Sequence, residues 1–92
     1  MPEVPEHRLK RLKMRSMRRG IKEMDLILSA FAEARLAGMD AAALDHYDLL
    51  LEENDHDLYQ WVTGQAAPPE DFAGLVAEIR AQYGTYARSD AI

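Results

Sequence analysis

The chain has 92 residues, of which 48% are hydrophobic, and this is enough for one domain with a small core. It contains no cysteine, which excludes disulfide frameworks, thiolate metal sites and cysteine nucleophiles within this sequence. The net charge of −5 conceals a division: residues 1–22 carry eight basic and two acidic side chains (+6), whereas residues 23–92 carry three basic and fourteen acidic ones (−11). A basic end joined to an acidic body predicts a polarised surface that orients a partner.

Two helices on either side of Gly20 are expected in the first half of the chain. The first covers residues 7–19 and places arginines on one face, because their spacing is 3-4-3. Its two faces carry Arg8, Arg11, Arg15 and Arg18 on one side and Leu9, Leu12, Ser16 and Met17 on the other. Gly20 permits a bend, and the second helix then runs over about residues 21–37 to a stop at Gly38. Its polar side is only a narrow wedge, which predicts a central place in the fold.

Three further helices are expected in the second half. The third covers residues 40–53, with Asp40 as its N-cap, and Asp55 is expected to cap a fourth helix over residues 56–63. The fifth begins near Pro69 and ends at Gly84. The faces expected to be buried carry Leu44, Tyr47, Leu50 and Leu51, then Leu58, Trp61 and Val62, then Phe72, Leu75, Val76, Ile79 and Tyr83. Asp45, Asp48 and Glu52 make the solvated face of the third helix.

The predicted fold is all-α, a small bundle of about five helices with short connections, since no segment shows an alternating strand pattern. We expect a single domain over residues 1–92. Within it, residues 1–6 form a flexible lead-in, residues 7–84 the helical bundle and residues 85–92 a loose tail. No apolar run approaches the roughly 18 residues that span a bilayer, so membrane insertion is not expected.

An enzyme is not expected from this set of residues. The serines lie outside any nucleophile motif, no glycine-rich phosphate loop is present, and the three histidines fall on separate elements. A metal site at His46 with its acidic neighbours is conceivable, but such carboxylates one turn apart are usual on solvated helix faces. Trp61 is expected in the core, whereas the role of Tyr59 stays open.

The basic helix admits several functional interpretations. Its arginines would suit a small helical nucleic-acid-binding regulator, but the acidic body and the lack of interleaved aromatic residues oppose that alternative. A mitochondrial transit peptide is also arginine-rich, yet a serine-rich spacer is missing here. A merely solvated helix remains possible. We favour a face that docks onto another protein.

Two blocks of sequence resemble a known family. Residues 19–23 read RGIKE and match an R-G-x-x-E signature within the longer run at residues 15–28, RSMRRGIKEMDLIL. Residues 47–61, YDLLLEENDHDLYQW, are similar to a second family pattern that ends in Asp-Leu-aromatic-x-Trp. These blocks resemble the small assembly factors for the flavoprotein subunit of succinate dehydrogenase, from bacteria and mitochondria. His56 departs from the pattern, because relatives often carry proline there.

The resemblance implies a non-enzymatic factor that binds the apo flavoprotein subunit, or an early FAD-loaded form, and promotes covalent attachment of FAD. The fumarate reductase flavoprotein is a possible second partner. FAD belongs to the partner, so the factor itself is expected to bind no cofactor stably and no nucleic acid. The expected compartment is the bacterial cytoplasm or, in a eukaryote, the mitochondrial matrix.

The resemblance also implies a docking surface around Arg19, Gly20 and Glu23. Gly20 lacks a side chain, so a partner's backbone can approach closely, and Arg19 can offer a forked pair of hydrogen bonds. Glu23 lies in the first turn of its helix, where the helix dipole stabilises a carboxylate, and it could pair either with a cation of the partner or with Arg19. Asp25 is expected to extend the contact. The remaining predicted contacts are those of Arg11, Arg15 and Arg18, which would steer the partner electrostatically.

Overall fold

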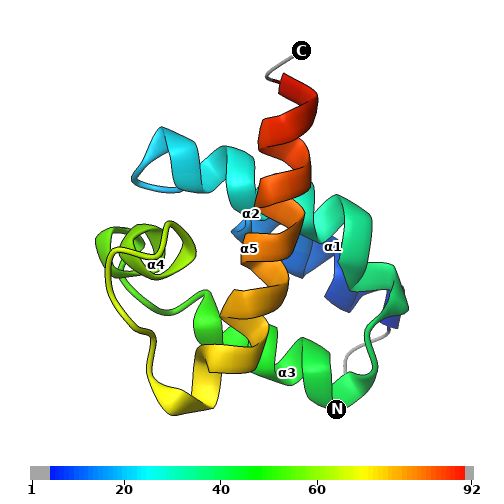
Figure 1. Ribbon diagram of the computed structural model, residues 1–92. Coiled ribbons are helices and arrows are strands. Elements are labelled where there is room, and N and C mark those ends of the chain that lie inside the picture. The colour runs from blue at the N-terminus through cyan, green and yellow to red at the C-terminus, as the bar shows by residue number, and fades with distance from the viewer. Residues whose placement is uncertain (1–4, 91–92) are drawn as a thin grey trace.

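The computed structural model describes residues 5–90, with side chains for residues 5–83. In this part of the chain there are five α-helices, one short 3-10 helix and no strand (Figure 1). The elements are α1 (Pro5–Arg15), α2 (Lys22–Arg35), η1 (Leu36–Gly38), α3 (Ala41–Leu50), α4 (Asp55–Val62) and α5 (Glu70–Asp90). The predicted all-α class with about five helices is confirmed.

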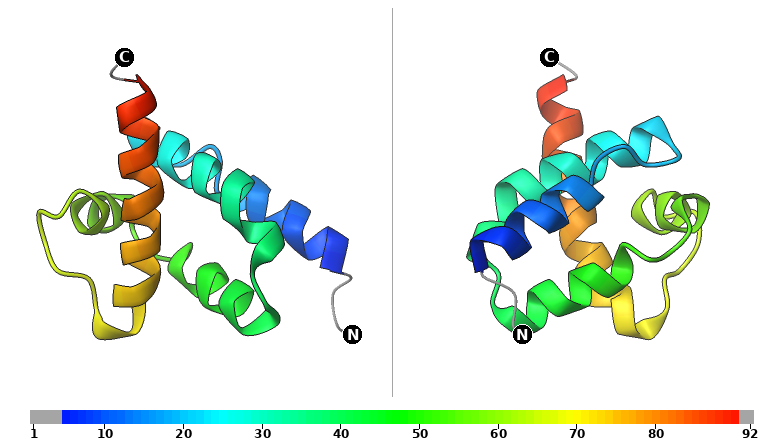
Figure 2. Two further views of the ribbon diagram at one scale, coloured as in Figure 1. Left: turned by 45° about the vertical axis from the view of Figure 1, so that its right-hand side comes forward. Right: turned by 180° about the vertical axis from the view of Figure 1, so that it is seen from behind.

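The five helices meet at one hydrophobic core. The long helix α5 packs against α2 and α4, and its C-terminal end projects beyond the other helices (Figure 1). On one side of α5, helices α1 and α3 run in the same direction, as both views of Figure 2 show. The buried hydrophobic residues are Leu12, Met24, Ile27, Leu28, Phe31, Ala32, Leu36, Leu44, Tyr47, Leu50, Leu51, Leu58, Trp61, Val62, Leu75, Val76 and Ile79. Each α-helix therefore anchors itself by at least one apolar side chain, as its periodicity predicted.

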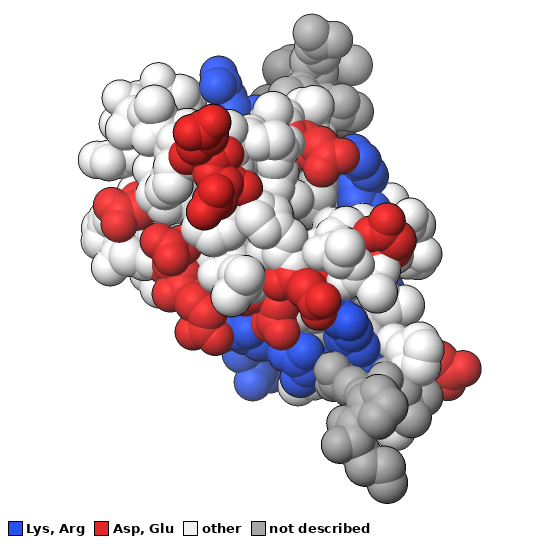
Figure 3. All heavy atoms as spheres, turned by 90° about the horizontal axis from the view of Figure 1, so that it is seen from below, with Lys and Arg blue, Asp and Glu red and all other residues white. Residues whose placement is uncertain are grey.

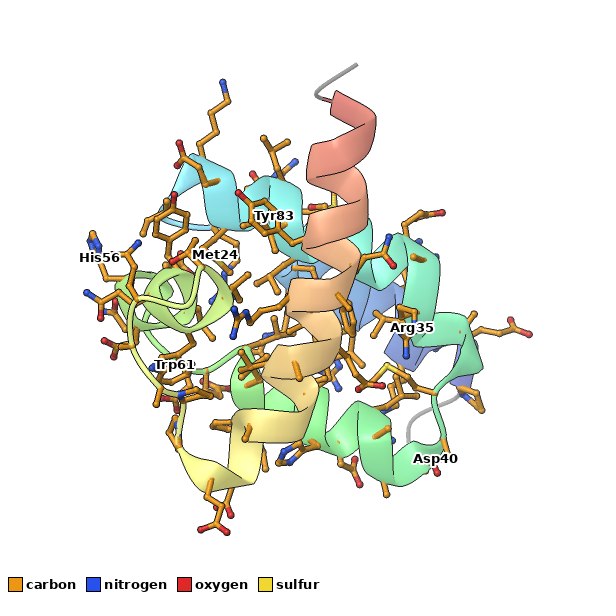
Figure 4. The ribbon with its side chains drawn as sticks, in the orientation of Figure 1. Met24, Arg35, Asp40, His56, Trp61 and Tyr83 are labelled. Atoms are coloured by element: carbon orange, nitrogen blue, oxygen red, sulfur yellow. The ribbon has the colours of Figure 1, made fainter. Side chains whose placement is uncertain are left out.

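Trp61 shows how α4 is held against α5. Its side chain lies between the two helices (Figure 4), only 8% exposed, and its ring stacks on Phe72 with centroids 6.4 Å apart. The predicted core position of Trp61 is confirmed. On the other side of α5, Arg35 of α2 reaches Glu78 with an N–O distance of 2.9 Å, so both neighbours of α5 contact it through side chains.

The first helix ends earlier than predicted, at Arg15 rather than Arg19. The chain tightens into 3-10 hydrogen bonds there, since the Met17 N–H donates to the Met14 carbonyl at 3.1 Å. Arg18 then adopts a left-handed conformation with φ 55°. The chain thus turns at Arg18 and also bends at Gly20, as expected, although Gly20 does not have a positive φ.

The N-caps of α3 and α4 test two predictions. Asp40 caps α3 as predicted, because its carboxylate accepts from the Ala43 N–H at 2.8 Å. The cap predicted for α4 is wrong by one residue: Asn54, not Asp55, accepts from the His56 N–H at 2.7 Å. The Asp55 carboxylate is engaged elsewhere, by the segment between α1 and α2. A carboxylate with stronger donors in reach leaves the capping role to its amide neighbour.

Both ends of the helical region extend further than predicted. Helix α1 begins at Pro5, inside the expected lead-in, because proline suits a first helical position. Helix α5 continues through Gly84 to Asp90, so the loose tail predicted for residues 85–90 is wrong. A glycine costs a helix about 1 kcal/mol relative to alanine, which a long helix can absorb. The rest of the predicted lead-in and tail, residues 1–4 and 91–92, lies outside the described residues.

One buried polar pair connects α1 and α3 inside the core. Ser16 is fully buried, and its hydroxyl donates to the Leu12 carbonyl at 2.8 Å. The Tyr47 hydroxyl forms a second hydrogen bond with the Ser16 hydroxyl, and their two oxygens lie 2.6 Å apart. Burial raises the pKa of Tyr47 to about 12, although the hydrogen bond with Ser16 opposes that rise. These bonds fix the end of α1 immediately before the residues of the expected docking surface.

Candidate functional site

The arginine face of α1 is matched by a carboxylate face on α3. The pairs are Arg8 with Asp45, Arg11 with Asp48, and Arg15 with both Asp48 and Glu52. We call them the α1–α3 ladder. The Arg11–Asp48 and Arg15–Glu52 N–O distances are both 3.0 Å, and hydrogen bonding from Arg11 is the largest influence lowering the pKa of Asp48. Figure 3 shows acidic and basic side chains adjoining one another on this face.

Asp45 and Glu52 are largely exposed, as the predicted solvated face requires, whereas Asp48 is half-buried, and all three also pair with arginines of α1. The α1–α3 ladder has a signal in the sequence. The three acids have the same 3-4 spacing as Arg8, Arg11 and Arg15, and each acid lies 37 positions after its arginine. Two parallel helices with matched spacing can pair rung by rung. The ladder uses charges that a nucleic-acid backbone would require, which disfavours the nucleic-acid alternative.

The predicted steering residues therefore divide into two kinds. Arg11 and Arg15 face α3 and are partly buried in the ladder. Arg18 is exposed and makes no hydrogen bond or ion pair with any residue described here. It lines a surface pocket together with Met14 and Met17, whose exposed fractions are 62% and 48%. Of these three arginines, Arg18 is thus the one that remains available to a partner.

A buried ion pair joins the loop between α1 and α2 (residues 16–21) to the start of α4. The Arg19 Nε–H donates to one oxygen of Asp55 at 2.8 Å, and the Gly20 N–H donates to the other oxygen at 2.5 Å. The side chains of Arg19 and Asp55 are only 12% and 13% exposed. We call these three residues the Asp55 clasp. It fixes the loop backbone at the signature residues.

Arg19 also closes the C-terminal end of α3. Its terminal nitrogens donate to the carbonyls of Leu51 and Glu53 at 3.2 and 3.4 Å, and to that of Arg15 at 3.0 Å. The carbonyls of Leu51 and Glu53 belong to the C-cap of α3 and to the turn after it, so the guanidinium satisfies backbone acceptors there and complements the helix dipole. The fork that was predicted to reach a partner is therefore directed into the molecule itself.

Gly20 has an intramolecular reason to be glycine. A Cβ added at Gly20 would lie 3.2 Å from an Asp55 carboxylate oxygen, closer than an ordinary van der Waals contact. The residue is nevertheless exposed, so a partner can reach its backbone. A larger side chain at Gly20 would both obstruct an incoming partner and push against the Asp55 clasp.

The two acidic residues of the signature region differ in availability. Glu23 is exposed in the first turn of α2 and forms no ion pair with Arg19 or with any other described residue. Asp25 is half-buried, and its carboxylate accepts from the Ser29 hydroxyl at 3.2 Å. Glu23 is thus a carboxylate held at a helix N-terminus and open to a cation from outside.

The histidine considered as a metal ligand has another role. His46 Nε2 donates to the backbone oxygen of Asp71, and its ring lies 5.1 Å from that of Phe72. Among the residues that the structure describes, no three His, Asp or Glu side chains are placed to share a metal ion. Nor is any helix of that part long and apolar enough to cross a membrane.

Comparison with known proteins identifies the family. The model of the family described as flavinator of succinate dehydrogenase matches residues 10–83, most of the chain. Mitochondrial succinate dehydrogenase assembly factor 2 of Schizosaccharomyces pombe is 36% identical over 87 residues, covering 95% of this chain and 61% of that protein. The Aspergillus terreus protein of the same name is 52% identical over 60 residues, covering 65% of this chain and 20% of that protein. The chain thus spans between a fifth and about three fifths of these relatives. It belongs to the family of flavinators of succinate dehydrogenase.

Proposed function

We propose that this chain is an assembly factor that binds the flavoprotein subunit of succinate dehydrogenase and promotes covalent attachment of FAD to it. The family and the names of the relatives support the assembly role. The observation that carries the proposal is the exposed surface at the end of the α1–α2 loop and the start of α2. There the Gly20 backbone and the Glu23 carboxylate, which has no ion-pair partner among the described residues, lie within the matched residues.

The factor acts by binding rather than by chemistry of its own. The exposed members of the predicted surface are Arg18, Gly20 and Glu23, so they form the direct contact. A cation and an anion flanking a side-chain-free backbone favour a partner loop with the opposite order of charges. FAD stays with the partner, whose domains the factor holds in the geometry that permits flavin attachment. The fumarate reductase flavoprotein is a second partner to test.

The place of action follows the partner. Both relatives described above are named as mitochondrial proteins. We propose that the chain works where the flavoprotein subunit folds, which is the mitochondrial matrix in a eukaryote and the cytoplasm in a bacterium.

Co-expression with the flavoprotein subunit tests the proposal. Covalently bound FAD, measured by in-gel flavin fluorescence, should rise with the wild-type chain and not with Gly20→Arg. Gly38→Arg is the matched control, because it adds the same side chain at an exposed glycine where a Cβ meets nothing within 4 Å. Equal fluorescence with Gly20→Arg and the wild type would refute the docking role of the loop.

A second pair of variants isolates the carboxylate. Glu23→Gln should weaken binding of the flavoprotein subunit, whereas Glu70→Gln should not. Both residues are exposed glutamates in the first turn of a helix, so loss of the favourable dipole interaction is common to both. A difference between them therefore reports the contact with the partner, and equal affinities would contradict it.

A further inference from the structure

We infer that Asp55 and Arg19 are positioning residues for docking, and that they act through the loop rather than by touching the partner. The inference rests on the proposed function, and it changes the role expected for Arg19. Sequence reasoning gave Asp55 only a capping role, which the structure assigns to Asn54. The Asp55 carboxylate is instead the one acceptor shared by a signature side chain and a signature backbone.

The geometry of the clasp sets the orientation of the docking loop. One Asp55 oxygen holds the Arg19 Nε–H and the other holds the Gly20 N–H, so two consecutive residues are fixed from a single point on α4. The described backbone–backbone bonds of the loop involve Ser16, Met17 and Ile21 but not Arg19 or Gly20, so Arg19 is held by its side chain and the Gly20 N–H by Asp55. Hydrogen bonds to an ionised group are roughly twice as strong as neutral ones. The loop thus depends on this carboxylate for its shape.

Burial separates the positioning residues from the contact residues. Arg19 and Asp55 are nearly enclosed, and the Arg19 donors already serve the carboxylate and three backbone carbonyls. A partner could use Arg19 only after breaking this set, which would leave a buried carboxylate without its cation. Gly20 and Glu23, by contrast, are exposed on either side of Ile21. A partner therefore contacts the exposed residues whose position the clasp fixes, and does not contact Arg19 or Asp55 directly.

The test compares Asp55→Asn with Asp57→Asn. Both substitutions remove one negative charge from the first turn of α4, but Asp57 is exposed and has no partner among the described residues. The measurement is the dissociation constant of the full chain with the recombinant flavoprotein subunit, by calorimetry. Loss of one charge-assisted bond of the loop corresponds to about tenfold weaker binding for Asp55→Asn, against less than about twofold for Asp57→Asn.

Two further readouts separate positioning from general stability. Hydrogen exchange of the Gly20 amide, followed by NMR, should be at least about tenfold slower in the wild type than in Asp55→Asn, because the carboxylate protects that N–H. The losses of binding free energy caused by Arg19→Gln and Asp55→Asn should also not be additive, because both variants break the same clasp. The double variant should therefore bind about as weakly as the weaker-binding single variant. At saturating concentrations of Asp55→Asn, covalent FAD should return to the wild-type level.

Each outcome decides one point. If the wild type does not bind the flavoprotein subunit, the proposed function fails, and the positioning role falls with it. If the wild type binds and Asp55→Asn binds equally well, the positioning role alone is overturned. If Asp55→Asn does not fold, hydrogen exchange of the Gly20 amide in the wild type still tests the clasp. An exchange rate equal to that of an unstructured chain would show that Asp55 does not hold this N–H. Arg19→Lys against the ion-paired control Arg35→Lys then replaces the affinity comparison, and equal affinities would overturn the role.

Discussion

Replacing Arg18 by glycine should stabilise the protein, because Arg18 is the one non-glycine residue of the described chain with a positive φ, 55°. A left-handed conformation costs an L-residue with a Cβ about 1–2 kcal/mol. Glycine avoids that cost but gains freedom in the unfolded chain, which offsets about 0.4–1 kcal/mol. The Arg18 side chain is exposed and forms no hydrogen bond or ion pair with the described residues, so its removal should change the free energy of unfolding little.

The net expectation for Arg18→Gly is a gain of about 0.5–1 kcal/mol in the free energy of unfolding. For a domain of this size the melting temperature should rise by about 2–8 °C. Arg18→Ala is the matched control, since it also removes the guanidinium but keeps the strained backbone. Denaturant unfolding should place Arg18→Ala about 0.5–1 kcal/mol below Arg18→Gly. Equal stability of the two variants would refute the assignment of strain to this residue.

Three more predictions concern stability. Tyr47→Phe should cost about 1 kcal/mol at neutral pH by removing a buried hydrogen bond. In the folded wild type the pKa of Tyr47 is about 12, against 10.0 for an unperturbed tyrosine. The free energy of unfolding of the wild type should therefore fall by about 2–3 kcal/mol between pH 10 and 12, because the unfolded chain loses this proton first. Urea titrations at each pH should show no such fall for Tyr47→Phe. Gly64→Ala should destabilise the protein by about 1 kcal/mol or more, because Gly64 has a φ of 82°. Gly74→Ala should stabilise it by up to about 1 kcal/mol, because a Cβ at this position on α5 would meet open space. Thermal melts that shift in the same direction for both variants would contradict these two expectations. A double-mutant cycle on Arg11 and Asp48 should give about 0.3–1 kcal/mol of coupling that shrinks in 1 M salt, and salt-independent coupling would argue against the ladder.

The presence of each helix could be predicted from the sequence, because the apolar residues that face the core recur at helical spacing. Leu44, Tyr47 and Leu50 recur at helical spacing and are all buried in α3. Helix ends were less predictable, since they depend on competition between nearby polar groups. Asp55 is a good capping residue by type, yet the arginine of another segment engages its carboxylate. Only the tertiary fold brings that donor into reach.

The sequence predicts a candidate site around residues 19–23, but it could not predict how the side chains are arranged there. The signature residues lie at the end of the α1–α2 loop and in the first turn of α2, and Gly20 is exposed. The spacing of residues along one helix cannot show that Arg19 turns inward, because its acceptors come from the end of α3 and the start of α4. The ladder was in principle readable, since Arg8, Arg11 and Arg15 share their spacing with three later acids. That inference requires knowing that α1 and α3 are parallel neighbours.

The most direct test of docking is a photo-crosslinking experiment on the full chain with the recombinant flavoprotein subunit. A photoreactive residue is placed at position 23 or, as control, at position 70; both sites are exposed first-turn glutamates on different helices. If Glu23 contacts the partner, a crosslink to the flavoprotein subunit should form from position 23 and not from position 70. Crosslinking from position 70 alone, or from neither position although the two proteins bind, would contradict it.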